Sequence, residues 1–275
     1  MEKLKRQSSS SQSAETKEKT GKTLFLIRHG ESKYNSEISR VNEQFVGEER
    51  VKKVRELRFS LELIDPSLTD EGERQAKELT SLLKNKNVGL VITSPMRRCL
   101  QTTRCAFSNH QSKPKMIVLP LLKEHSLGTC DIPDDIKTIE SDFPEFDYFL
   151  LNDYSCKELW FVDMMENEEQ KKAFYTEMER DGSSHAADGI EKVHKIMTQE
   201  MVKAHPIAYE SLEDLNKRVD KIKKWRKEQL RGVKDEESVV VVAHSYILQT
   251  FISKDGLVKL KTGEIYEHFL SFDEE

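Results

Sequence analysis

The stretch Leu24-Phe25-Leu26-Ile27-Arg28-His29-Gly30-Glu31-Ser32 decides the fold of this 275-residue chain. An apolar run of strand length stops at Arg28 and helix-compatible residues follow, so the pattern predicts a strand over residues 23–27. Arg28 and His29 then emerge at the carboxyl end of that strand. Open α/β sheets bind ligands at this end, and we therefore expect both side chains in a binding crevice.

The residue types at this strand end suit a phosphate ligand. A neutral imidazole such as that of His29 can attack phosphorus, and the neighbouring guanidinium of Arg28 can hold two phosphoryl oxygens. Gly30 permits close approach of the backbone to an anion, and amide groups of the following helix start would point at the same anion. The alternative interpretation is a strand-ending turn with a surface histidine.

Further strands are predicted along the chain, with helices between them. Residues 88–92 and 116–119 form short apolar runs, and residues 264–272 alternate as an edge strand does. Residues 238–243 are almost wholly apolar and β-branched, which is typical of a central parallel strand. The sequence therefore predicts an α/β fold, a three-layer sandwich around a mostly parallel sheet.

Polar residues follow three of these strands, and we take Arg97, Glu124 and His244 as candidates for the same crevice. Ser94-Pro95 is expected to begin the helix that carries Arg97, because proline suits a first helical turn. Arg98 would point about 100° away around that helix, and it is assigned to surface or structural pairing.

A basic stretch precedes the second predicted strand. Apolar residues recur near helical spacing over residues 42–64, with Lys52, Lys53, Arg55 and Arg58 between them. We interpret this stretch as a solvated helix, and a phosphate-facing patch is the alternative.

Two regions stand outside the alternation of strands and helices. Residues 1–22 have too few apolar groups to offset the cost of ordering them, and they are expected to be a disordered tail. Residues 128–207 are irregular, and we expect them to be a folded cap inserted in a single domain, 23–275, and lying over the pocket. Its core is expected to hold most of the aromatic side chains there, which are Phe143, Phe146, Tyr148, Phe149, Tyr154, Trp160 and Phe161.

The composition limits location and partners. The chain has 44 basic and 49 acidic side chains and a formal net charge of -5, so no global charge recruits nucleic acid or an anionic membrane. No apolar run approaches membrane-spanning length, the amino terminus lacks a hydrophobic signal region, and the 4 cysteines lack paired C-x-x-C spacing. We therefore expect a cytoplasmic protein with reduced cysteines.

Four short islands of sequence follow one another: Arg28-His29-Gly30-Glu31 with Asn35, then Thr93 to Arg98, then Glu124, and then Val239 to His244. Together they resemble the histidine phosphatase (phosphoglycerate mutase-like) superfamily, from about residue 23 to about residue 252. The resemblance implies a phosphoglycerate mutase-like fold. An aspartate after the second histidine would have marked the acid-phosphatase branch, but Ser245 stands there.

The resemblance also implies roles for the site residues. His29 becomes the phosphohistidine, and His244 is the second histidine, a donor to the phosphoryl group. Arg28 and Arg97 would neutralise the phosphoryl oxygens, where transition-state charge is spread. Glu124 matches the acid/base position, which protonates the leaving oxygen and later takes a proton from water. The substrate-binding residues are expected to be Arg28, Asn35, Arg97 and His244.

We expect a metal-independent phosphomonoesterase that needs no cofactor and acts on a small phosphate ester, since no Asp, Glu and His cluster has metal-ligand spacing. The alternatives are a phosphoglycerate mutase, a catalytically idle protein that binds phosphorylated ligands, and a nucleic-acid binder, which the net charge does not support. A mutase has to bind a substrate carboxylate, which Asp131, Asp134 and Asp135 would repel, so hydrolysis is favoured. The sequence indicates neither the physiological substrate nor the oligomeric state.

Overall fold

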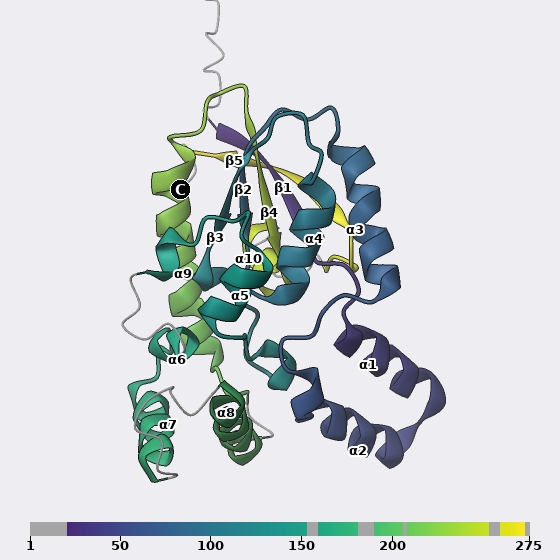
Figure 1. Cartoon of the computed structure of the whole chain (residues 1–275), viewed down its shortest axis with the longest axis vertical. Coiled ribbons are helices and arrows are strands. Elements are labelled where there is room, and N and C mark those ends of the chain that lie inside the picture. The colour runs from purple at the N-terminus through teal and green to yellow at the C-terminus, as the bar shows by residue number, and fades with distance from the viewer. Residues whose placement is uncertain (1–20, 153–158, 181–189, 206–207, 253–258, 273–275) are drawn as a thin grey trace, which may run out of the picture.

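A computed structural model describes residues 21–152, 159–180, 190–205, 208–252 and 259–272. Its centre is a sheet with the strand order β3-β2-β4-β1-β5, in which β5 runs antiparallel and the others run parallel (Figure 1). The strands are β1 (Gly21–Arg28), β2 (Val88–Thr93), β3 (Lys115–Val118), β4 (Ser238–Ala243) and β5 (Ile265–Ser271). The prediction of a mostly parallel α/β sheet is confirmed.

Helices surround this sheet. The α-helices among the described residues are α1 (Lys33–Gln44), α2 (Gly47–Arg58), α3 (Asp70–Leu83), α4 (Arg97–Phe107), α5 (Ile136–Asp142), α6 (Trp160–Asp163), α7 (Glu168–Arg180), α8 (Ile190–Ala204), α9 (Leu212–Leu230) and α10 (Ser245–Ile252). The short 3-10 helices are η1 (Leu61–Leu63), η2 (Pro120–Leu122), η3 (Thr129–Asp131) and η4 (Phe149–Leu151). None of the helices described is long and apolar enough to cross a membrane.

The sheet separates two helical layers because its parallel strands are apolar on both faces. On β1, Phe25 and Ile27 pack with α3 and α4, whereas Leu24 and Leu26 pack with α9 and α10. Successive residues of a strand point to opposite faces, so one short strand contributes to both hydrophobic clusters. The sheet and the helical layer packed on each of its faces form the three-layer sandwich that the sequence predicts.

The register of β1 and β4 places two histidines side by side. Arg28 pairs with Ala243 in this parallel ladder, so His29 and His244 are the next residues on the two strands. The His29 amide also donates to the Ala243 carbonyl oxygen at 3.1 Å. Strand pairing therefore determines where both histidines lie.

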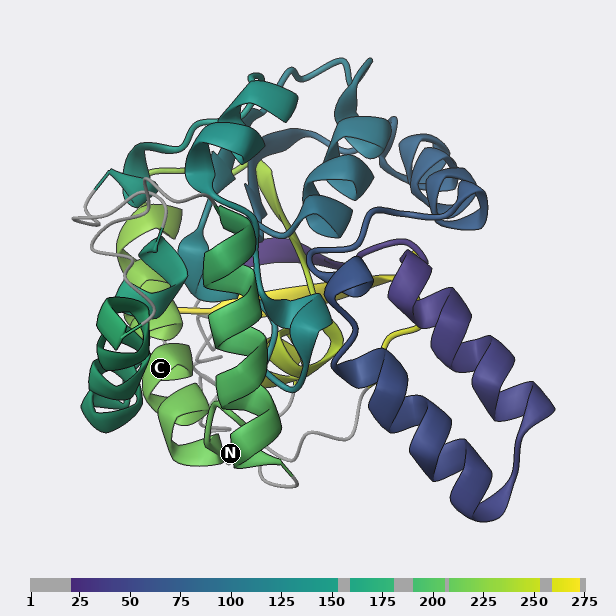
Figure 2. The ribbon, with the colours of Figure 1, turned by 60° about the horizontal axis from the view of Figure 1, so that its bottom comes forward.

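Helices α1 and α2 form a hairpin that projects away from the sandwich (Figure 2). None of the residues of α2 is buried, so the prediction of a solvated helix is confirmed for most of its length. The first strand, β1, begins at Gly21, two residues earlier than the sequence predicts. The rest of the predicted tail, residues 1–20, lies outside the described residues.

The described part of residues 129–204 contributes most of one hydrophobic cluster, which also includes Leu100 of α4, Val118 of β3 and Tyr209. Trp160 and Phe174 are fully buried in this cluster, and Ile132 is 1% exposed. The cluster holds five of the aromatic residues predicted for it, Phe143, Phe146, Tyr148, Trp160 and Phe161. Phe149 is instead 43% exposed, and Tyr154 lies outside the described residues.

A backbone contact between two glycines joins the end of β1 to α3. A Cβ atom added to Gly30 would lie 2.4 Å from the Gly72 carbonyl oxygen, and one added to Gly72 would lie 2.0 Å from the Glu31 carbonyl oxygen. Real Cβ atoms do not come so close to backbone atoms, so only glycine fits at either position. This packing, rather than the approach of an anion, explains Gly30.

Replacing Gly72 with alanine is expected to lower the free energy of unfolding by about 1–3 kcal/mol, the usual cost of overpacking. Alanine raises helix propensity within α3, so a net loss isolates the clash with the Glu31 backbone. Gly232→Ala is the control, because its added Cβ would meet only the Gln229 carbonyl oxygen, at 3.5 Å. Urea unfolding compares the two variants, and equal stabilities would contradict the packing argument.

Candidate active site

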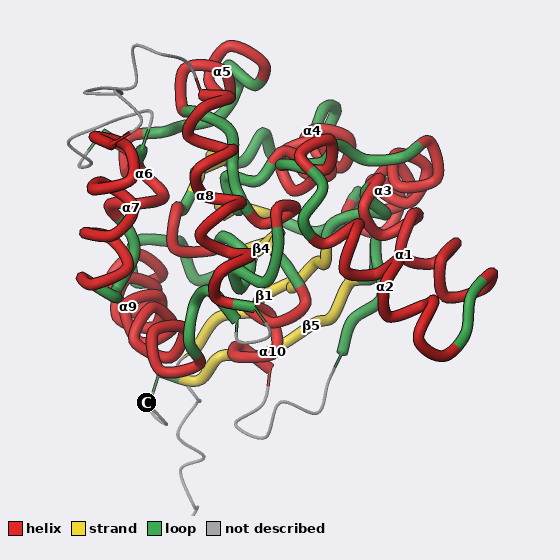
Figure 3. Tube along the Cα trace, turned by 90° about the horizontal axis from the view of Figure 1, so that it is seen from below, coloured by secondary structure: helices red, strands yellow, loops and turns green. Residues whose placement is uncertain are grey.

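A cavity of about 390 Å³ lies at the carboxyl ends of β1 and β4, the side of the molecule seen in Figure 3. Described residues beyond 131 in the insertion do not line it, although the insertion was expected to lie over the pocket. The lining residues are Arg28, His29, Ser32, Tyr34, Asn35, Arg58, Arg98, Glu124, Leu127, Gly128, Cys130, Asp131, Ser245, Tyr246, Gln249 and Lys259.

His29 is buried in a form suited to attack. Its side chain is 4% exposed, and Nδ1 lies 2.7 Å from the Gly30 carbonyl oxygen. A carbonyl oxygen only accepts, so Nδ1 donates its proton and Nε2 keeps a free lone pair. Burial, together with the charges of Arg98 and Arg28, holds the pKa of His29 well below its usual value. The imidazole is therefore neutral, as a nucleophile has to be.

His244 is fully buried against His29. The two ring centroids lie 5.1 Å apart in an edge-to-face arrangement. Nε2 of His244 lies 2.8 Å from the Ser94 hydroxyl oxygen and 3.5 Å from the Cys99 sulfur. Burial, followed by the charge of Arg98, holds the pKa of His244 well below its usual value. The His244 ring is therefore neutral and packs against the His29 ring. Its role as a donor to a phosphoryl group stays a prediction.

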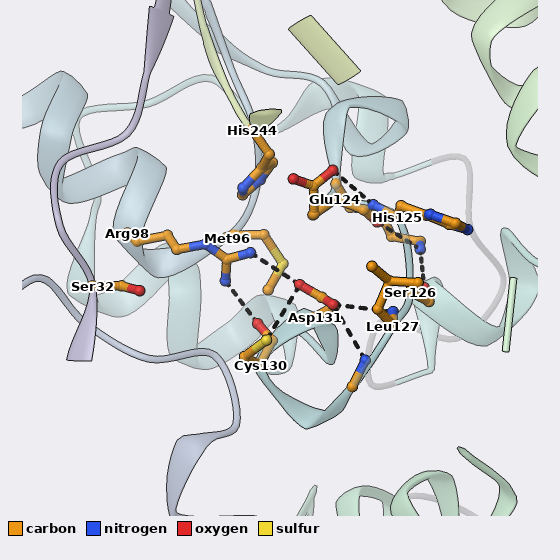
Figure 4. A network of polar contacts seen from close by, with 12 residues as sticks. Ser32, Met96, Arg98, Glu124, His125, Ser126, Leu127, Cys130, Asp131 and His244 are labelled. Atoms are coloured by element: carbon orange, nitrogen blue, oxygen red, sulfur yellow. Dashed lines mark hydrogen bonds and ion pairs between the residues drawn. The ribbon is translucent and has the colours of Figure 1, made fainter. Parts of the chain in front are cut away.

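The structure reverses the expected placement of two adjacent arginines. Arg97 points away from the cavity and pairs with Asp134, at 3.1 Å, and with Asp142. Arg98 is 4% exposed, lines the cavity and pairs with Asp131 at 3.3 Å (Figure 4). The expectation that Arg97 reaches the crevice is therefore wrong, and Arg98 takes that place.

The start of α4 explains the reversal. The helix begins at Arg97 rather than at Ser94-Pro95, and Met96 is its extended N-cap residue. Met96 is fully buried, and the Arg97 amide donates to the Asp65 carboxylate at 2.9 Å. Arg97 and Arg98 do point in directions about 100° apart, as expected for neighbouring helical residues. Because the helix begins later than expected, Arg98 rather than Arg97 faces the cavity.

Arg28 is held by its backbone surroundings and left open toward the cavity. One terminal nitrogen donates to the Leu260 carbonyl oxygen at 2.9 Å. Its Nε is buried and has no hydrogen-bond partner among the described residues. Since Arg28 lines the cavity beside His29, its unused donor capacity is available to an anionic ligand.

Glu124 lies on the cavity wall, in a segment without helix or strand structure. Its carboxylate accepts from the His125 amide at 2.9 Å and from the Tyr246 amide at 3.4 Å. Burial, followed by the charge of Asp131, raises the pKa of Glu124 to about 7. A pKa near neutrality suits a group that first gives a proton and then takes one.

The hairpin of α1 and α2 supplies a further wall. Arg58, the last residue of α2, lines the cavity, and its carbonyl oxygen accepts from the Thr129 hydroxyl at 3.1 Å. A Cβ atom added to Gly128 would lie 2.6 Å from that carbonyl oxygen, so glycine permits the contact. Tyr34 lies beside Arg58, and burial raises the pKa of its hydroxyl. The alternative interpretation of the basic stretch, a phosphate-facing cation, thus remains open for Arg58.

The amide groups of the two residues before α1 are already occupied. The Glu31 amide donates to the Gln75 side-chain oxygen at 2.9 Å, and the Ser32 amide donates to the Asn35 side-chain oxygen at 3.3 Å. The expectation that amides near this helix start point at an anion is therefore wrong for Glu31 and Ser32. Asn35 lines the cavity while its side chain caps α1, and its contact with a substrate stays a prediction.

The charge of the cavity favours an anion over a cation. Its lining holds four cationic side chains, Arg28, Arg58, Arg98 and Lys259, and two acidic ones, Glu124 and Asp131. In the part of the chain that the structure describes, no group of three or more His, Cys, Asp or Glu side chains could hold a metal ion. The cationic side chains that line the cavity are three guanidinium groups and one ammonium group.

Sequence reasoning did not place the charged residues Arg58, Arg98, Asp131 and Lys259 in this cavity. Arg98 lies in one of the quoted islands, but local spacing does not distinguish its direction from that of Arg97. Asp131 was considered only as a repulsive charge, and Arg58 only within a basic stretch. Their positions depend on contacts between segments far apart in the chain, and a local pattern carries no signal for such contacts.

The fold and the cavity together define an α/β sandwich with a cavity at the carboxyl ends of its strands, lined by His29 and by more cationic than acidic side chains. The chain belongs to the histidine phosphatase superfamily, branch 1, whose family model matches residues 24–185, more than half of the chain.

Curated relatives match parts of the chain. A probable phosphatase of Schizosaccharomyces pombe is 32% identical over 132 residues, which make up 46% of this chain and 52% of that protein. The fructose-2,6-bisphosphatase TIGAR B of Danio rerio is 29% identical over 110 residues, or 39% of this chain and 35% of that protein. The matches thus span about half or less of the relatives' lengths.

Solved structures match nearly the whole chain at low identity. The phosphoglycerate mutase of Bacillus anthracis is 17% identical, with 92% of this chain and 89% of that chain covered and a TM-score of 0.48. The alpha-ribazole phosphatase of Shigella flexneri is also 17% identical, with 90% and 94% covered and a TM-score of 0.47.

Arg98 and Arg97 are expected to differ in their effect on anion binding. Inorganic vanadate mimics five-coordinate phosphorus, and Arg98→Gln should weaken its binding roughly tenfold or more, since a hydrogen bond to a charged group is worth about 1.5–3 kcal/mol. Arg97→Gln is the matched control and should leave the affinity within about twofold. Isothermal titration measures both, and equal losses would contradict the placement of Arg98.

Proposed function

We propose that this protein hydrolyses phosphate monoesters without a metal ion, through a phosphohistidine intermediate on His29. One observation carries the proposal. The Nδ1 proton of His29 is directed to the Gly30 carbonyl oxygen, which leaves the Nε2 lone pair for attack on phosphorus. Membership of the histidine phosphatase superfamily supports chemistry of this kind.

In the first step, His29 Nε2 forms a bond to phosphorus, and the bond between phosphorus and the ester oxygen breaks. Arg28 and Arg98 stabilise the charge on the equatorial oxygens, where it accumulates in the transition state. Protonated Glu124 gives its proton to the leaving oxygen, so an alcohol departs. A pKa of about 7 keeps a large fraction of Glu124 protonated at neutral pH.

In the second step, water attacks the phosphohistidine. The Glu124 carboxylate takes a proton from the water, the bond between phosphorus and Nε2 breaks, and its electron pair returns to His29. Inorganic phosphate leaves, and the protonation state of the enzyme is restored. His244 is fully buried and does not line the described cavity, so we propose that it supports the His29 ring and reaches the phosphoryl group only where a bound ester lies against both rings.

Trapping the intermediate tests this function. Brief exposure to a labelled phosphate ester, in excess chelator, is expected to leave an acid-labile adduct on His29. His29→Ala should abolish both the adduct and the turnover. His110→Ala should retain them, because His110 is buried but does not line the cavity. Vanadate binding without adduct or turnover would instead identify a catalytically idle ligand-binding protein.

Glu124→Gln is expected to slow an alkyl phosphate roughly a hundredfold, in line with general acid catalysis, and p-nitrophenyl phosphate far less. The difference arises because p-nitrophenolate leaves without a proton, whereas an alkoxide does not. In the unmodified protein, turnover of the alkyl phosphate should fall as pH rises through about 7, where Glu124 loses its proton. The variant should lack this limb of the pH profile. Equal losses on both substrates would reassign Glu124 to positioning.

Mutase activity is the second candidate, and two side chains favour it. Arg58 and Lys259 line the cavity in addition to the two arginines assigned to the phosphoryl group. A phosphoglycerate mutase needs further cationic groups of this kind to bind the carboxylate of its substrate. The cavity therefore has the charges for either reaction.

The expected repulsion of a carboxylate by three aspartates is largely absent. Asp131 is compensated by Arg98, and Asp134 pairs with Arg97 outside the cavity. Asp135 caps the start of α5 and does not line the cavity either. The charge argument against a mutase therefore fails, and a direct measurement has to distinguish the two reactions.

We predict hydrolysis, measured by NMR on 3-phosphoglycerate with and without 2,3-bisphosphoglycerate. Phosphate release should exceed any conversion to 2-phosphoglycerate. Interconversion faster than phosphate release would overturn the phosphatase assignment. In that case Arg58→Gln should reduce the interconversion, whereas Arg55→Gln, at an exposed position of the same helix, should not.

A further inference from the structure

Arg218 lies within α9, far from the end of the helix, and its side chain is only 1% exposed. A buried guanidinium costs several kcal/mol in desolvation unless its donors find partners, so the partners show what the residue does. Nε and one terminal nitrogen of Arg218 donate to the two carboxylate oxygens of Glu210, each at 2.8 Å. Burial acts to raise the pKa of Glu210, but the charges of Lys123 and Arg218 hold it at about 2. The Glu210 carboxyl group is therefore ionised.

The remaining donors of Arg218 bind the backbone that leads into Glu124. One terminal nitrogen donates to the carbonyl oxygens of Leu121 and Lys123, both at 2.7 Å. The other donates to the carbonyl oxygen of Glu124 itself, at 3.3 Å. One rigid, planar group thus holds three carbonyl groups of this segment in place.

Glu210 binds the same segment on the other side of Glu124. Its carboxylate accepts from the Ser126 amide at 3.1 Å, and its carbonyl oxygen lies 2.7 Å from Nε2 of His125. Lys123 adds an ion pair with Glu210 at 3.5 Å. Figure 4 shows Glu124, His125 and Ser126 in succession, and Glu124 is the one of the three that lines the cavity.

These contacts matter because residues 124–127 have neither helix nor strand structure. The place of the Glu124 carboxyl group therefore depends on side chains that bind its neighbours. Neither Arg218 nor Glu210 lines the cavity, so neither can touch a substrate there. Any effect of the pair on the reaction has to pass through Glu124.

We propose that Arg218 and Glu210 are positioning residues that hold the Glu124 carboxyl group at the leaving oxygen. The proposal rests on the proposed function, in which Glu124 is the general acid. A misplacement of about 1 Å in such a group can cost on the order of a hundredfold in rate. In this proposal, the residues that the reaction depends on include a buried side chain of α9 outside the cavity.

Arg218→Lys tests the proposal, because lysine keeps the charge but loses the planar fork. Turnover of an alkyl phosphate is expected to fall roughly tenfold to a hundredfold, and that of p-nitrophenyl phosphate by less than about threefold. KM for both substrates should change little, because the phosphate ligands are untouched. Glu210→Gln should give the same pattern, and it carries the test if Arg218→Lys does not fold.

Arg226→Lys is the matched control. Arg226 lies two turns further along α9, is 5% exposed and lines a separate apolar cavity against the sheet. Its replacement also removes a buried guanidinium from the helix, but it should affect the two substrates equally. Selective loss on the alkyl phosphate in Arg226→Lys would overturn the proposal, since general loosening of α9 would then explain the effect.

A double-mutant cycle with Glu124→Gln decides whether Arg218 acts through Glu124. Arg218→Lys should have no further effect on the alkyl phosphate once Glu124 is glutamine. Additive losses, or equal losses on both substrates, would overturn the positioning role alone. Absence of leaving-group discrimination in Glu124→Gln itself would overturn the acid assignment as well, which separates a failure of the proposed function from a failure of this inference.

Discussion

The parallel pairing of β1 with β4 is the constraint on which the candidate site depends. Both strands are buried on both faces, so a slip of one residue would exchange the side chains that face the two helical layers. The same slip would separate His29 from His244, whose rings are held 5.1 Å apart by the register. The hydrophobic packing of the sheet therefore also fixes the geometry of the two histidines, before any ligand binds.

Burial then determines the protonation states around that pair. His29 and His244 are kept neutral by desolvation and by nearby guanidinium groups. Desolvation and the charge of Asp131 raise the pKa of Glu124 to about 7. Asp131 also forms an ion pair with Arg98. One carboxylate thus orients a cation that faces the cavity and raises the pKa of the proposed acid, so the two effects are physically coupled.

The rest of the cavity is assembled from segments that the sheet does not order. The close approach of Gly128 to the backbone of Arg58 brings the hairpin of α1 and α2 to the cavity wall. Arg218 and Glu210 hold the segment that carries Glu124 through hydrogen bonds to its backbone. The described insertion beyond residue 131 packs in a cluster shared with Leu100 and Val118 of the sandwich and does not line the cavity. These parts of the cavity wall therefore depend on contacts between segments outside the sheet.

The sequence by itself determined the sheet, the strand ends with His29 and His244, and the presence of Glu124 after the third predicted strand, because apolar periodicity and short motifs are local properties. Only the tertiary structure decided that Arg98 faces the cavity and Arg97 does not, since that choice depends on where α4 begins and on acidic partners more than 30 residues away. The contact of Arg218 with the Glu124 carbonyl oxygen spans 94 residues of chain. No local pattern encodes such a contact, because the two segments become neighbours only when α9 packs against the sheet.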